Sequence, residues 1–204
     1  MCYSAEISFN TYVFGTIIAI ILLLLNKTPI IIIYFAYTVS LIQLMEYLIW
    51  INMNNPNYND SNNNNIYYLS IIGSLILLIQ ILIINIYYLE GIERIIVIIL
   101  IIILFLYLSY YNTKYTKNIA SVGKNGHLIW HWIDVEYVNV IGLFFWIYPL
   151  IRSENYLLLL IIIPSLLFSV YNYYKYKTFG SMWCYIGNIV WLLLLFNAII
   201  LLLR

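Results

Sequence analysis

The chain has few charged residues. Asp, Glu, Lys and Arg together make up 8% of its 204 residues, whereas a soluble domain carries about 25%. Hydrophobic residues make up 65%, and the mean hydropathy is +0.94. This composition excludes an ordinary soluble domain and indicates an integral, multi-pass membrane protein whose surroundings are the lipid bilayer. The net charge of +1, without a basic patch or a Gly-rich phosphate loop, argues against a nucleic-acid partner.

Cysteine and histidine are also scarce, and several catalytic motifs are missing. The two cysteines, Cys2 and Cys184, allow at most one disulfide. The chain has no Gly-x-Ser-x-Gly elbow and no His-Glu-x-x-His motif. Its last apolar segment has no lysine for a retinal Schiff base. These absences argue against a nucleophile-elbow hydrolase, a zinc protease of that motif and a retinal protein.

What the chain has in excess is long apolar segments. A transmembrane helix needs about 20 apolar residues, and backbone groups in lipid must be hydrogen-bonded within the segment, which favours helices here. No alternating pattern of a membrane barrel is present. We therefore predict an all-α integral membrane protein, a single bundle of seven transmembrane helices. The predicted spans cover residues 7–25, 30–51, 66–89, 92–111, 128–151, 156–174 and 182–203.

The bundle is expected to form one domain over residues 1–204, with an Asn-rich, low-complexity loop at 52–65 and a polar loop at 112–127. Seven spans place the two ends of the chain on opposite faces of the membrane, and we call the face at which the chain begins face A. The positive-inside rule does not orient the bundle, because face A carries five Lys and the opposite face carries four Lys or Arg.

Threading the chain through seven spans brings polar and aromatic residues from four segments to face A. We predict that they form a one-sided polar pocket there. The candidate pocket residues are Cys2, Ser4, Glu6, Gln43, Glu46, Trp50, Trp130, Ser181, Trp183 and Cys184.

The stretch QLMEYLIW contributes three of these candidates. Gln43 and Glu46 are three residues apart and Trp50 follows after four more, so all three share one face of a helix. An ionisable group inside a span is costly and is read first as functional. The alternative is a protonated Glu46 that is hydrogen-bonded inside the bundle. Trp50, taken alone, is typical of the aromatic belt at a membrane surface.

The stretch GHLIWHWID contains both histidines. His127, His131 and Asp134 have the spacing i, i+4 and i+7, which is one stripe if the helix already covers them. Such a stripe can hold a metal ion, the one cofactor that the sequence suggests, or can relay protons. The same residues also fit interfacial histidines at the start of a helix, and the sequence favours this interpretation over a metal site.

The stretch FGSMWC opens the last predicted span. Ser181 is expected to be a helix N-cap, which places Cys184 in the first turn, where the helix dipole favours a thiolate. A buried cysteine that behaves as a small hydrophobic residue is the alternative. Because both cysteines lie at face A, Cys2 and Cys184 are predicted to be neighbours.

Three blocks of the sequence, MCYSAEISF, QLMEYLIW and GSMWCYIG, resemble an uncharacterised family of multi-pass membrane proteins. Its members begin Met-Cys-aromatic-Ser-Ala, carry a Gln/Glu/Trp cluster in the second helix and have a Ser-x-Trp-Cys start to a late helix. The resemblance implies one family signature and implies no activity. In this chain the signature comprises Cys2, Ser4, Gln43, Glu46, Ser181, Trp183 and Cys184.

The run HLIWH is similar to the His-x-x-Trp-His run of seven-span membrane amidases related to alkaline ceramidases. In that family the run lies in the last helix, and a third histidine and an aspartate complete a zinc site. Here the run lies in the middle of the chain, which has no third histidine.

The function favoured by the sequence is binding, sensing or transport of a small ligand or an ion at the pocket on face A. One alternative is a membrane-embedded, thiol- or metal-dependent enzyme of the hydrolase kind. A second alternative is a structural or assembly protein. Carriers usually bind near the middle of the membrane between repeats, and the one-sided cluster and the lack of a visible repeat argue against classical alternating access.

Overall fold

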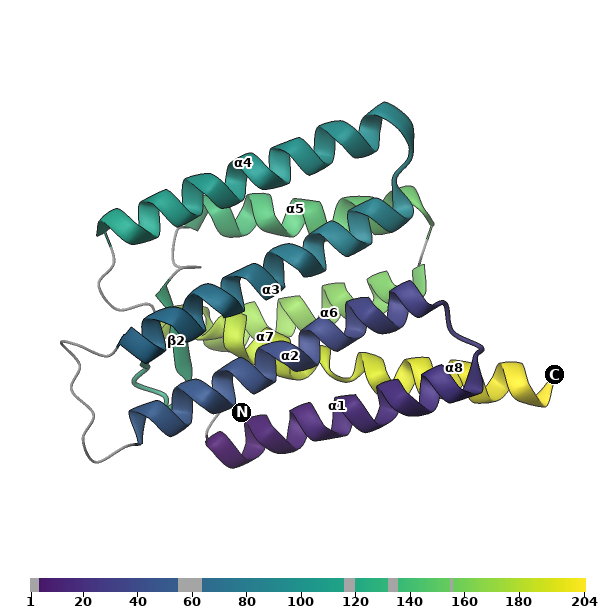
Figure 1. The fold of residues 1–204 in the computed structure, drawn as a ribbon, viewed down its shortest axis with the longest axis horizontal. Helices are drawn as coiled ribbons and strands as arrows, with labels where there is room; N and C mark the ends of the chain where they lie inside the picture. Colours follow the sequence, from purple (N-terminus) through teal and green to yellow (C-terminus); the bar gives the residue numbers. More distant parts are fainter. Residues whose placement is uncertain (1–3, 55–63, 116–119, 132–135, 155) are drawn as a thin grey trace.

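The computed structural model describes residues 4–54, 64–115, 120–131, 136–154 and 156–204 (Figure 1). Apart from turns and short connections, these described residues form helices and one two-stranded hairpin. In order, the elements are α1 (Ala5–Leu25), α2 (Ile30–Met53), α3 (Asn64–Tyr88), α4 (Gly91–Tyr115), β1 (Ala120–Val122), β2 (Leu128–Trp130), α5 (Glu136–Arg152), α6 (Tyr156–Tyr173), the 3-10 turn η2 (Tyr174–Tyr176), α7 (Phe179–Gly187) and α8 (Val190–Leu203).

The predicted seven-helix membrane fold is confirmed. Six stretches of the described helices are long and apolar enough to cross a membrane, and α7 and α8 together supply the last of them, Phe179–Leu203. The remaining span is the shorter apolar helix α5. As an odd number of spans requires, α1 begins at one end of the bundle and α8 ends at the other (Figure 1). We keep the name face A for the end at which α1 begins.

The predicted fifth span was wrong in its first part, because residues 128–130 form strand β2. β2 pairs antiparallel with β1, with Ala120 opposite Trp130. Gly126 has a positive φ of 78°, and the Gly123 N–H donates to the His127 carbonyl at 2.7 Å. This turn lets the chain return on itself and satisfy its backbone locally, so α5 begins only at Glu136.

The two predicted loops differ from the structure in their limits. α2 continues to Met53 and α3 already begins at Asn64, so most of the Asn-rich segment 52–65 lies outside the described residues. The segment 112–127, predicted as a polar loop, contains the end of α4 and the whole of β1. The hairpin lies at the face A end of the bundle, beside the start of α7 (Figure 1).

A buried polar junction joins α1, α2 and the break between α7 and α8. Trp191 Nε1 donates to Ser40 Oγ at 2.7 Å, and Ser40 Oγ donates to Asn188 Oδ1 at 3.1 Å. Asn188 Nδ2 donates to the carbonyl oxygen of Cys184 at 2.9 Å, next to the break. Gly15 of α1 lies directly against this junction, because a side chain there would overlap Ser40 and Trp191.

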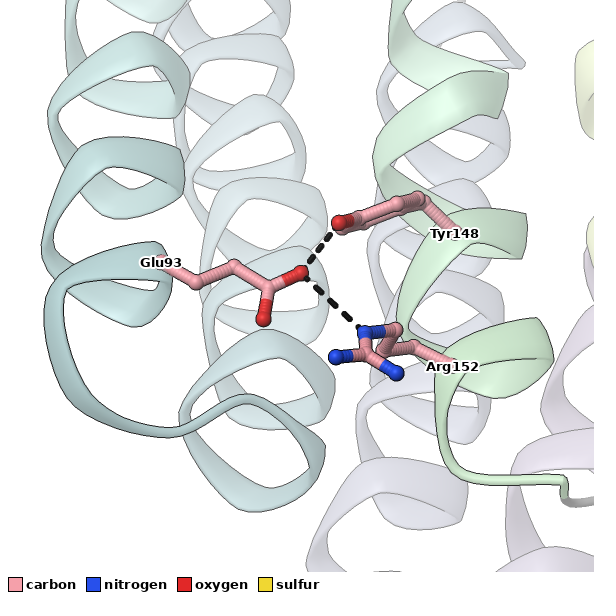
Figure 2. Close-up of polar contacts among 3 residues, drawn as sticks. All are labelled: Glu93, Tyr148 and Arg152. Carbon is pink, nitrogen blue, oxygen red and sulfur yellow. Dashed lines mark hydrogen bonds and ion pairs between the residues drawn. The ribbon is translucent and has the colours of Figure 1, made fainter.

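Two further contacts hold α5 in place. Asn85 Nδ2 donates to the Phe145 carbonyl at 2.8 Å and so joins α3 to α5. At the end away from face A, Glu93 of α4 accepts a hydrogen bond from Tyr148 and lies 3.6 Å from Arg152 Nε, both in α5 (Figure 2). Of the span in α4, only 11% is buried inside the protein. The Glu93 contacts therefore fasten a helix whose surface otherwise faces mostly lipid.

The junction at Gly15 leads to a prediction about stability. In the Gly15→Ala variant, the new Cβ would lie 2.0 Å from Ser40 Oγ and 2.6 Å from Trp191 Nε1, so the three helices must move apart. Overpacking of this kind costs about 1–3 kcal/mol, and we expect a lower thermal unfolding midpoint in detergent. The matched control is Gly73→Ala, whose Cβ meets nothing within 4 Å. Equal stability of the two variants would contradict the close packing at Gly15.

Candidate functional site

The predicted polar pair in α2 lies inside the bundle. Gln43 and Glu46 are fully buried, and Gln43 Nε2 donates to Glu46 Oε2 at 3.0 Å. The amide hydrogen bond gives one carboxyl oxygen of Glu46 a partner inside the bundle, where lipid would offer none. Trp50 is only 7% exposed, so its interpretation as a residue of the aromatic belt was wrong. It packs instead in a cluster with Trp130 of β2.

The start of α1 contributes less to this region than predicted. Ser4 is the N-cap of α1, and its Oγ accepts a hydrogen bond from the Ile7 N–H at 3.3 Å. Glu6 is exposed in the first turn, where its charge complements the helix dipole. Glu6 thus differs from the buried Gln43 and Glu46, and Cys2 lies outside the described residues.

The start of α7 lies two residues before the predicted cap. Its N-cap residue is Thr178, so the interpretation of Ser181 as N-cap was wrong, and Ser181 is a buried residue of the helix. Thr178 Oγ1 accepts a hydrogen bond from Asn125 Nδ2 in the hairpin turn at 2.9 Å. This contact aligns the hairpin with α7.

Cys184 lies in the second turn of α7, not in the first turn as predicted. Its thiol is free and buried in an apolar cluster, and it interacts electrostatically with Glu46. The predicted proximity of Cys2 and Cys184 concerns a residue outside the described ones and stays a prediction.

The two histidines do not lie on one helical stripe, because β2 separates them. In an extended strand, residues four apart are about 13 Å apart along the chain. His127 is 1% exposed and packs edge-on against the Tyr173 ring, 5.4 Å between centroids. His131 Nε2 shares a hydrogen bond of 2.7 Å with Ser121 Oγ. Asp134 lies outside the described residues, and among those described there is no group of three or more His, Cys, Asp or Glu arranged to hold a metal ion.

A cavity of about 140 Å³ lies between the helices α3, α4, α5 and α7. Three tryptophans line it: Trp130 of β2, Trp146 of α5 and Trp183 of α7. The rings of Trp146 and Trp183 meet edge to face, with centroids 5.3 Å apart. The other lining side chains are mostly aliphatic or phenylalanine, with Cys184 on the α7 wall. We call this space the tryptophan cavity.

A second cavity, of about 40 Å³, neighbours the first, because Trp146, Trp183 and Cys184 line both. Trp183 Nε1 donates to Ser165 Oγ of α6 at 3.1 Å. Gln80 of α3 also lines this space and is only 1% exposed. Its amide has no hydrogen-bond partner within the described part of the chain, and burial of an unpaired amide costs about 1–3 kcal/mol. We call this space the glutamine cavity.

Sequence reasoning selected Trp130, Trp183 and Cys184 and missed three other residues. Gln80 had a readable signal, since it and Asn85 are the two amides within the long aliphatic run of α3. Ser165 follows Pro164 in α6, and Trp146 lies in α5 among other aromatic residues. Neither had a sequence pattern that distinguishes a cavity wall from a lipid-facing surface.

Comparisons of this chain with protein-family models, with curated proteins and with solved structures find no match.

The buried His127 predicts a pH dependence of stability. Burial lowers the pKa of His127 from 6.5 to about 4. The unfolded chain therefore takes up the proton more readily, so stability falls as the pH falls from about 6.5 towards 4. Between pH 7 and pH 5 the loss is about 2 kcal/mol.

Thermal unfolding in detergent at the two pH values measures this loss. His127→Phe keeps an aromatic ring against Tyr173 and removes the titrating group, so its unfolding midpoint should change much less. His131→Gln is the control and should keep the native pH dependence. An equal loss in the native protein and in His127→Phe would show that His127 is not the cause.

Proposed function

We propose that this polytopic membrane protein binds a small, mainly apolar ligand in the tryptophan cavity. The observation that carries the proposal is a space of about 140 Å³ inside the bundle whose wall includes three indole rings. The sequence left open whether the protein binds a small ligand or an ion, and the residues that line the cavity favour a small ligand. An ion needs charged groups or several oxygen ligands, whereas the lining residues that the structure describes carry no charged side chain.

The size of the cavity suits a compact apolar group. An engineered protein cavity of about 150 Å³ lined by aliphatic and aromatic side chains stays dry and takes up benzene. A group of about six carbons is therefore a reasonable occupant here. The three tryptophans supply flat apolar surfaces, and Cys184 adds a polarisable sulfur.

The position of α4 supports entry from the bilayer. α4 forms one wall of the cavity and has most of its surface outside the protein core. Its ties to α5 through Glu93 lie at the end away from face A (Figure 2). An apolar ligand dissolved in the membrane can therefore reach the cavity beside α4 without crossing water.

The two alternatives that the sequence left open, a membrane-embedded enzyme and a structural or assembly protein, remain alternatives to ligand binding. A thiol enzyme needs an acid or base beside its nucleophile. Glu46 interacts electrostatically with Cys184, so this alternative stays open, although the other groups around the thiol are mostly apolar. Binding is also the step that sensing and transport share.

We further infer that the chain is related to the multi-pass family that its three sequence blocks resemble. What supports this relation is the packing of the helices that carry the blocks, because α2 contacts both α1 and α7. Residues of one family signature would thus act in one region at face A.

Filling the tryptophan cavity tests the proposed function. Gly142 lines it, and a Cβ at this position meets nothing within 4 Å, so Gly142→Leu adds carbon to the free space. Binding of 1-bromohexane is measured in lipid nanodiscs by quenching of tryptophan fluorescence. We expect saturable quenching in the native protein and at least about tenfold weaker binding in Gly142→Leu.

The matched control is Gly73→Leu, because Gly73 also lies in a helix with no atom within 4 Å of a new Cβ, yet does not line the cavity. Its binding should equal that of the native protein. Quenching that rises linearly with the probe concentration, and equally in all three proteins, would reflect simple partition into lipid and would contradict the proposal.

A further inference from the structure

We propose that the ligand is a neutral amphiphile with a hydroxyl head that hydrogen-bonds to Gln80 and an apolar tail that fills the tryptophan cavity. This inference rests on the proposed function and adds the chemical class of the ligand. It assigns a polar binding site to the glutamine cavity, which lies apart from the Gln43–Glu46 pair.

The first observation is the state of Gln80. Its side chain is 1% exposed and lines a cavity, and neither its amide oxygen nor its amide nitrogen has a hydrogen-bond partner in the described structure. Other buried amides of the bundle are used in packing: Asn85 donates to the Phe145 carbonyl, and Asn188 bonds to Ser40. Gln80 thus has both a donor and an acceptor available toward the cavity.

The second observation is the charge of the walls. Among the described residues that line the two cavities, none carries a charged side chain, so a charged head would find no counter-charge from them in a low-dielectric space. A hydroxyl group is neutral and both donates and accepts, which matches the two halves of a carboxamide. The volume of about 40 Å³ is roughly three times the 10–15 Å³ that one water molecule needs by this measure. It is much smaller than the tryptophan cavity and suits a hydroxyl on its carbon.

The third observation is the wall that the two cavities share. Trp146, Trp183 and Cys184 line both spaces, so the two cavities are neighbours and can take the head and the tail of one short molecule. The Trp183 indole is fixed in the shared lining by its bond to Ser165, which also lines the glutamine cavity. In the proposed complex, the hydroxyl head lies beside Gln80 and the tail lies among the tryptophans.

The experiment compares two probes that differ only in the head, 6-bromohexan-1-ol and 1-bromohexane. Both are titrated into the native protein and Gln80→Met in nanodiscs, and quenching of tryptophan fluorescence is followed. The substitution keeps the length of the side chain and removes the amide. We expect it to weaken binding of the alcohol about tenfold, the value of one hydrogen bond, and to leave binding of the bromoalkane unchanged. Taking the ratio between proteins for each probe removes differences in lipid partition.

Each outcome separates this inference from the proposed function. If neither probe binds saturably, the proposed function itself is wrong. If the bromoalkane binds but Gln80→Met weakens both probes equally or neither, the apolar site stands and the hydroxyl site is overturned. An unchanged affinity for both probes is expected if water alone occupies the glutamine cavity. The thermal unfolding midpoint of Gln80→Met verifies that the variant is folded. Because the substitution removes an unpaired amide, this midpoint should be at least that of the native protein.

Discussion

The structure depends on one constraint: a polar group inside a bilayer must find its partner within the protein, because lipid offers none. The helices present almost uniform aliphatic surfaces, which pack against lipid as well as against each other. The few buried polar side chains therefore select which helices meet. Ser40, Asn188 and Trp191 join α2 to the last span, and Asn85 joins α3 to α5. Gly15 then allows α1 to approach the first of these junctions closely.

The polar contacts that this constraint produces also leave a cavity inside the bundle. The Glu93 contacts hold α4 to α5 at one end (Figure 2), while the hairpin and the start of α7 occupy the face A end. Between these ends, the broad rings of Trp146 and Trp183 keep the helices apart and leave the tryptophan cavity. Gln80 is one of several buried side chains without a hydrogen-bond partner in the described structure, and it is the one whose whole amide is unpaired and lines a cavity.

Much of the fold could be predicted from the sequence, because a membrane span is a long apolar run that composition alone reveals. The burial of Glu46 followed from the cost of its charge, and its bond to Gln43 from helical spacing. The hairpin could not be predicted, because its strands have three residues each and HLIWH fits a helix equally well. The walls of the cavities depend on which side of α5 and α6 faces inward. In a helix that is apolar on all sides, sequence periodicity does not show this, so Trp146 and Ser165 were missed.

The proposed function requires that an apolar molecule occupies the space between α3, α4, α5 and α7. A crystal structure of the protein with 1-bromohexane, in which anomalous scattering locates the bromine atom, measures this occupancy directly. We expect a bromine peak inside the bundle, next to the rings of Trp146 and Trp183. Bromine found only on the lipid-facing surfaces of the helices, with the cavity filled by side chains, would contradict the proposed binding site.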